Sequence, residues 1–262
     1  MILLGIALAL PSTGKAEVSP AEAKKLFDNC KVEAERGKPA AQFAIGSGYL
    51  LGVGVEVDQP QGVIWLRKAA DQGHAPAQHL LGSCFFNGWG YDKNQTEAVK
   101  WFKKAADQGH APAQSILGIC YVNGWGCEKD QTEAVKWFKK AADQGDPRAQ
   151  FELGYCYYAG RGVEMDKALA APLLRKASEQ GIAEAHFLIG ACYRFGRGVP
   201  KDLVEAYAYY TLSDLASDDP RKTLLNLLKE KMTPEEIIKG EQRAKELKGQ
   251  IQARLNATPS GK

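Results

Sequence analysis

The sequence has little net charge, because 34 Lys and Arg residues are nearly balanced by 31 Asp and Glu residues, for a formal charge of +3. A surface that binds nucleic acid normally needs clustered Lys and Arg. The lysine clusters, such as Lys100, Lys103 and Lys104, lie close to Glu or Asp and are typical of solvated helix faces. We therefore expect no nucleic acid partner.

Apolar runs long enough to span a membrane are also lacking. The N-terminal run at residues 2–10 is too short to cross a bilayer but is typical of the core of a secretory signal. Gly14 and Ala16 offer a cleavage point, although no Lys or Arg precedes the run. The alternative, a buried first helix, is disfavoured by Pro11 and Gly14. We expect residues 1–16 to be a signal peptide and the protein to be exported, periplasmic or secreted; the alternative is a cytoplasmic protein.

Motifs for catalysis or metal binding are scarce. The four histidines show no metal-ligand spacing with Cys, Asp or Glu. Ser12 and Lys15 fit the Ser-x-x-Lys form of penicillin-recognising enzymes, but no Ser-Asp-Asn or Lys-Thr-Gly motif follows. Gly88 and Gly90 follow no expected strand, so they do not predict a phosphate loop. We expect no enzyme activity, no cofactor and no metal.

The main feature of the sequence is an internal repeat. The segment QTEAVKWFKKAADQG occupies residues 95–109 and returns unchanged at residues 131–145. A fixed period in this range indicates stacked supersecondary units, each of which buries its apolar face against its neighbours. The period divides the chain into five repeats at residues 38–73, 74–109, 110–145, 146–181 and 182–217.

Each repeat carries the signals of two helices. The first helix is expected to end at a glycine in the left-handed conformation, at Gly52, Gly88, Gly124, Gly160 or Gly196. The second is expected to begin at an Asp or Asn N-cap, at Asp58, Asn94, Asp130, Asp166 or Asp202. Glu97, Glu133 and Glu205 are expected to complete capping boxes. Large and small residues such as Trp101 and Ala105 allow neighbouring helices to pack closely.

The segments that flank the repeats lack the period. Ser19, Pro20 and Glu22 predict the start of a capping helix within residues 17–37. Capping helices are also expected at residues 218–255, followed by a flexible tail at residues 256–262. The predicted fold is all-α: a right-handed α-solenoid of five 36-residue helix-pair repeats with N- and C-terminal capping helices.

The repeat pattern resembles a known family. Ala77, Gln78, Leu81, Gly82 and Phe85 are followed by a Gly-x-Gly loop, by Asn94, and by an A-x-x-W-x-x-K-A-A-x-x-G segment that ends at Gly109. This pattern is similar to that of the Sel1-like repeat family, which is related to tetratricopeptide repeats, and the resemblance covers residues 38–217. The resemblance implies an adaptor that holds other proteins.

Four cysteines occupy equivalent positions in successive repeats, at Cys84, Cys120, Cys156 and Cys192. Equivalent points on neighbouring repeats are about one helix spacing apart, roughly 8–10 Å, which exceeds disulfide reach. We expect buried free thiols. Disulfide-rich relatives carry a second cysteine set that this chain lacks, and Cys120 with Cys127 is the one near pair for which a bridge stays open.

One face of the first helices varies between repeats and is rich in aromatic residues. We expect it to line the concave side of the solenoid and to bind a partner, because Tyr, Phe and Arg make strong anchors. The predicted partner-binding residues are His79, Phe86, Phe151, Tyr155, Tyr158, Phe187 and Arg194. The alternative is that some of them pack against the second helices or the caps. Trp89 and Trp125, in Gly-flanked loops, either form a secondary contact site or fold over the helix ends.

These features favour a non-catalytic scaffold that binds a protein or peptide. A hydrolase of the penicillin-recognising type is the alternative from another class, and it requires a polar catalytic group in the groove. A cytosolic regulatory adaptor is the third reading, which the sequence of the mature N-terminus distinguishes from the first.

Overall fold

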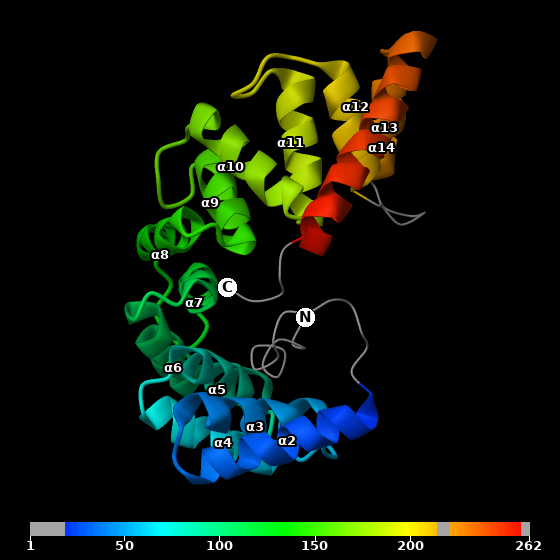
Figure 1. The fold of residues 1–262 in the computed structure, drawn as a ribbon. Coiled ribbons are helices and arrows are strands. Elements are labelled where there is room, and N and C mark those ends of the chain that lie inside the picture. The colour runs from blue at the N-terminus through cyan, green and yellow to red at the C-terminus, as the bar shows by residue number, and fades with distance from the viewer. Residues whose placement is uncertain (1–18, 214–220, 258–262) are drawn as a thin grey trace. The chain divides into compact units, whose positions relative to one another are not determined.

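The computed structural model describes residues 19–213 and 221–257, and within these ranges every regular element is an α-helix (Figure 1). The described helices form two compact units, which divide between Asp130 and Gln131. The expected signal peptide, most of the expected tail and the last residues of the fifth repeat lie outside the described residues.

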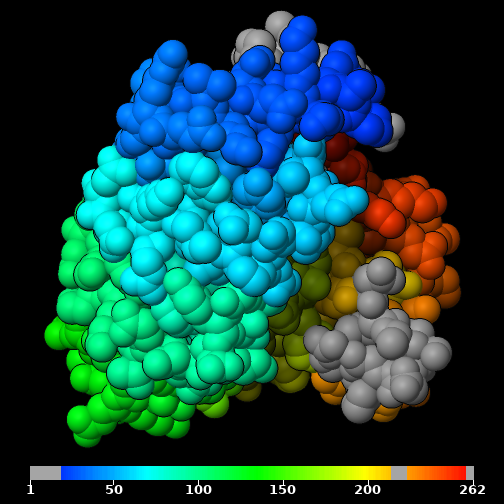
Figure 2. Space-filling model, turned by 90° about the horizontal axis from the view of Figure 1, so that it is seen from below, coloured from blue at the N-terminus to red at the C-terminus, as the bar shows by residue number. Residues whose placement is uncertain are grey.

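The first unit consists of one capping helix and five repeat helices. Each helix packs against the next along the chain. In Figure 2 they appear as successive layers coloured from blue to green. The helices are α2 (Pro20–Glu35), α3 (Pro39–Leu51), α4 (Gln59–Asp71), α5 (Ala75–Asn87), α6 (Gln95–Asp107) and α7 (Ala111–Asn123).

The second unit continues the helix pairs and ends in the C-terminal helices. The long helix α14 packs along α12 and also contacts α10. The C-terminal helix therefore covers the last repeat. The helices are α8 (Gln131–Asp143), α9 (Pro147–Ala159), α10 (Lys167–Glu179), α11 (Ala183–Phe195), α12 (Leu203–Leu212), α13 (Arg221–Lys229) and α14 (Pro234–Ala257).

The helix ends confirm most of the predicted capping signals. Ser19 and Glu22 form a complete capping box at the start of α2. The predicted glycines adopt the left-handed conformation after each first helix, as at Gly88 with a φ of 83°. The side chain of Asn94 accepts a hydrogen bond from the Glu97 amide at 2.9 Å. These caps set the lengths of the helices that carry the site.

The predicted capping boxes at Asn94 and Asp202 are wrong. The backbone N–H of Asn94 donates to the carbonyl of Phe85 at 2.9 Å, and that of Asp202 donates to Tyr193 in the same way. The N-cap amide is therefore already satisfied by the first helix of the same repeat. The glutamates are free to pair elsewhere, Glu97 with Lys100 and Glu205 with Arg243.

The core of each repeat centres on one residue of the second helix. It follows the position that is Trp65, Trp101 and Trp137 in the first three repeats. These side chains are almost completely buried. A glycine on the first helix makes room for four of them: a Cβ at Gly82 would lie 2.7 Å from the ring of Phe102. The contact between this large side chain and the glycine thus sets the distance between the two helices of a pair. The buried residues are Leu66, Phe102, Phe138, Leu174 and Tyr210.

The second glycine of each inter-helix loop lies against the second helix of the preceding repeat or, in the first repeat, against α2. Gly90 has a φ of 70°, and a Cβ there would lie 2.8 Å from the carbonyl oxygen of Gln59. Gly126 makes the equivalent approach to the carbonyl of Gln95. A side chain has no space at these points, so glycine is required here because the backbones of successive repeats are in direct contact.

All six cysteines are free thiols, and the four at equivalent positions are buried, as predicted. Burial raises the pKa of Cys84 and Cys120 to about 12. These thiols therefore act as small apolar core residues. Over the part of the chain that the structure describes, no helix has both the length and the apolar character needed to span a bilayer.

Candidate functional site on the first helices

The variable face of the first unit is a row of half-buried aromatic rings. Phe43 lies against His74, with ring centroids 5.2 Å apart, and His79 lies against His110 at 5.3 Å. In both contacts a residue of one first helix packs on the N-cap of the next first helix. The face is therefore partly used for packing between successive first helices.

Trp125 extends this row from the adjoining loop. Its ring lies 5.3 Å from that of Phe86, and 38% of Trp125 remains exposed. Trp89 is half-buried. The loop tryptophan of one repeat thus lies over the first-helix aromatic of the preceding repeat. The predicted secondary loop site and the helix face are one continuous surface around Phe86.

The histidines of this row are held in the neutral form. Burial, together with the nearby His110, lowers the pKa of His79 to about 4. Burial also lowers the pKa of His74 and of His110. Across the described residues no group of three His, Cys, Asp or Glu is placed to hold a metal ion. The histidines therefore contribute neutral rings to the surface.

Acid should weaken the first unit through His79. Its pKa of about 4 in the folded chain lies below the ordinary 6.5, so the unfolded chain binds the proton more readily. We expect the free energy of unfolding to fall by about 2.5 kcal/mol between pH 6.5 and pH 4. Urea titrations across this range measure the loss.

The His79→Phe variant is the matched control, because Phe occupies the equivalent position at Phe43, Phe151 and Phe187. It should remove the largest part of this pH dependence and leave stability at pH 7 nearly unchanged. An identical slope in the variant would contradict the assignment to His79.

In the second unit, the variable face of α9 carries the half-buried Tyr155 and Tyr158. Tyr155 stacks on Phe151 with parallel rings and centroids 6.3 Å apart. The guanidinium of Arg161 lies 4.8 Å from the Tyr155 ring. Phe151 itself is only 9% exposed and belongs to the core. The structure therefore places Phe151 beneath the predicted surface and Tyr155 on it.

Tyr158, one turn later on α9, is surrounded by cations. Arg197 donates a hydrogen bond to the Tyr158 hydroxyl at 2.6 Å. Lys167 lies 4.6 Å from the centre of the Tyr158 ring. Arg197 occupies the loop position that Trp125 occupies in the first unit, and its partner Tyr158 is equivalent to Phe86. The same repeat geometry thus places a loop side chain over a first-helix ring in both units.

The face continues on α11. Phe187 lies against the buried Tyr210, with ring centroids 5.1 Å apart. Arg194 lies 5.1 Å from the ring of Phe195, which is 54% exposed. Arg197 approaches the same ring at 4.9 Å. Exposed aromatic surface and arginine side chains therefore occur together at this end of the face.

Sequence reasoning missed Arg161 and Arg197 as members of the site. Both follow the glycine that ends a first helix, where they read as ordinary loop residues. The signal that would have identified them is their equivalence to Trp89 and Trp125. The assignment of the partner-binding residues to a concave side stays a prediction, and Ser12 and Lys15 lie outside the described residues.

Comparison with known proteins matches the chain to the Sel1 repeat model in five consecutive segments. Each begins one residue after the boundary expected from the sequence. The matched residues are 39–74, 75–110, 111–146, 147–182 and 183–213. Comparison with curated proteins found no match.

The solved structures that are similar to this chain include two Sel1-type repeat proteins. A Sel1 repeat protein from Oxalobacter formigenes is 33% identical, with a TM-score of 0.72, over 86% of this chain and 92% of that one. The c5321 protein, a protective antigen of uropathogenic Escherichia coli with an SLR fold, is 26% identical, with a TM-score of 0.61, over 90% of this chain and 59% of that one. The chain is a helix-pair solenoid and belongs to the Sel1 repeat family.

Proposed function

We propose that the protein is a non-catalytic scaffold whose first-helix face binds an extended, acidic segment of a partner protein. The observation that carries the proposal is the group of cations around Tyr155 and Tyr158. Tyr and Arg are enriched among the residues that dominate binding energies, because large rings bury area at low entropic cost. Membership of the Sel1 repeat family supports a binding role for this face.

Charge favours an acidic partner segment. Arg161, Arg194 and Arg197 form no ion pair within 4 Å with any described residue. Arg148, in contrast, pairs with Glu152 and Glu184. Arginines without an ion-pair partner attract carboxylates, and the planar guanidinium group also stacks on aromatic rings. An Asp- or Glu-containing peptide meets both requirements.

The double variant Tyr155→Ala and Tyr158→Ala tests this proposal. Peptides are first selected from a random display library on the immobilised chain, and their affinities are then measured by calorimetry. We expect the double variant to bind the selected peptides about 100-fold more weakly, because two anchor side chains are removed. Its helical circular dichroism should be unchanged, since both tyrosines are half-buried.

The matched control is Leu169→Ala, on the exposed side of α10, where the leucine is 49% exposed. This variant should bind the same peptides as the unchanged chain does. Selected peptides should be enriched in Asp and Glu, and their affinity should fall as salt rises. Peptides that bind the tyrosine variant as tightly as the unchanged chain would overturn the proposal.

We further propose that the protein is exported. The support is the apolar run at residues 2–10 and the small residues that follow it. N-terminal sequencing of the protein from its native cells is the test. A mature chain that starts near Glu17 supports export, and a chain that retains the apolar run would contradict it.

A further inference from the structure

A cavity of about 420 Å³ lies in the second unit, between the last full helix pair and the C-terminal helix. It is lined by side chains of α10, α11, α12 and α14 and of the loop before α12. Three of its lining side chains are cations, Arg175, Lys201 and Arg243. It lies apart from the tyrosines of α9, none of which contributes to its wall.

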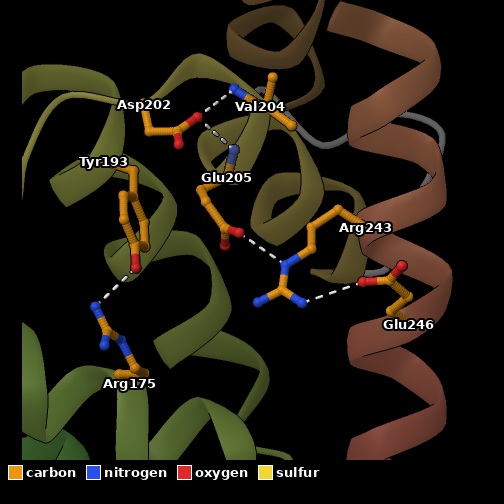
Figure 3. A network of polar contacts seen from close by, with 7 residues as sticks. All are labelled: Arg175, Tyr193, Asp202, Val204, Glu205, Arg243 and Glu246. Atoms are coloured by element: carbon orange, nitrogen blue, oxygen red, sulfur yellow. Dashed lines mark hydrogen bonds and ion pairs between the residues drawn. The ribbon is translucent and has the colours of Figure 1, made fainter.

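The carboxylates that line the cavity are already committed to partners. Asp202 accepts hydrogen bonds from the Val204 and Glu205 amides at 2.8 and 3.0 Å, as the cap of α12. Glu205 accepts a hydrogen bond from Arg243 Nε at 2.7 Å, and Glu179 pairs with Arg254. Figure 3 shows the Asp202 and Glu205 contacts. Each of the three acids therefore has at least one partner within the chain that offsets its charge.

Arg175 is incompletely satisfied, and a comparison within the chain shows why. Its Nη2 donates to the Tyr193 hydroxyl at 2.7 Å, but its buried Nε has no hydrogen-bond partner. At the equivalent position of the first repeat, Arg67 Nε donates to the Tyr91 hydroxyl at 3.2 Å. Val199 stands where Tyr91 would be required in the fifth repeat. The arginine beside the cavity has therefore lost the partner that its counterpart keeps.

Other donors face the same cavity. Arg243 uses Nε for Glu205 and Nη1 for Glu246, which leaves Nη2 without a hydrogen bond to a described residue. Figure 3 shows Arg243 on the opposite side from Arg175 and Tyr193. Lys201 forms no ion pair with any described residue. The Tyr209 hydroxyl is also a donor at neutral pH, and burial raises its pKa further, to about 12.

We propose that this cavity binds a carboxylate group, carried by a small organic acid or by the C-terminus of a peptide. A planar carboxylate matches the fork of donors that a guanidinium presents. Three cations and three carboxylates line the wall, and the fixed carboxylates oppose a second negative charge, so a carboxylate is favoured over hydrogen phosphate. This site is separate from the proposed peptide-binding face.

Calorimetry on the full chain tests the proposal with four probes: propionate, acetyl-tetra-alanine with a free C-terminus, the same peptide as its C-terminal amide, and inorganic phosphate. We expect saturable binding of the free peptide or of propionate, and none of the amide or of phosphate. Binding of the peptide alone identifies a peptide C-terminus as the ligand, and binding of both probes identifies a general carboxylate site.

Variants decide whether the binding occurs in this cavity. Arg175→Gln and Lys201→Glu should each weaken carboxylate binding at least 10-fold, and the exposed Lys201 position keeps the test valid if Arg175→Gln fails to fold. Arg67→Gln removes the equivalent arginine from a repeat and should leave binding unchanged. The tyrosine double variant of α9 should also bind normally. No saturable carboxylate binding, equal binding of phosphate, or equal loss in Arg67→Gln would overturn the proposal.

Discussion

Replacing Gly126 by Ala should lower the free energy of unfolding by about 3 kcal/mol or more. Gly126 has a φ of 68°, a conformation that itself costs an L-residue about 1 kcal/mol. In addition, the new Cβ would overlap the carbonyl oxygen of Gln95, a backbone atom of the preceding helix pair. Relief requires the two repeats to separate, which exposes buried surface. Denaturant titration followed by circular dichroism measures the loss.

Gly109→Ala is the matched control for this prediction. Gly109 also has a positive φ, 86°, but a Cβ there would meet no atom within 4 Å. Only the backbone conformation is penalised, so we expect a loss of about 1 kcal/mol. The difference between the two variants isolates the contact between repeats. Equal losses of stability in the two variants would show that Gly126 is required only for its backbone conformation and not for the contact between repeats.

Replacing Phe102 by Ala should cost about 3–5 kcal/mol, the range for truncating a fully buried phenylalanine. Phe102 is completely buried and fills the space above Gly82 on the paired helix. Its loss leaves a cavity that the helix pair cannot close without moving both helices. The same titration measures this effect.

Phe102→Leu is the matched control, because leucine keeps a large apolar side chain at this position and alanine does not. Leucine occupies the equivalent position in two other repeats, as Leu66 and Leu174, and both are completely buried there. We expect this variant to lose less than about 1.5 kcal/mol. A large loss in the leucine variant, or a small one in the alanine variant, would show that this position is not the centre of the repeat core.

The helical architecture could be predicted from sequence because its signals are local and recur. Ser19 with Glu22, the C-terminal glycines such as Gly88, and the N-caps such as Asn94 each act within one turn of helix. Five copies at one spacing then identify the packing units without any long-range information. The expected role of Glu97 failed because the Asn94 amide finds its acceptor on the other helix of the pair.

The composition of the site could be predicted only in part, because it depends on contacts between repeats. Tyr158 was identified from its variable position, but the cation that covers it, Arg197, comes from the loop of the next repeat. Phe151 shares the sequence face of Tyr155 yet is buried. The cavity beside Arg175 was missed because α14, which supplies Arg243, lies outside the repeat period.

Photo-crosslinking of a display-selected peptide tests the binding face most directly. A benzoylphenylalanine placed at Tyr155 is compared with one at Leu169, which is exposed on the neighbouring second helix. If the first helices carry the binding surface, the peptide should crosslink from position 155 and not from position 169. Crosslinking from position 169 alone, or equally from both positions, would contradict the assignment of partner binding to the first-helix face.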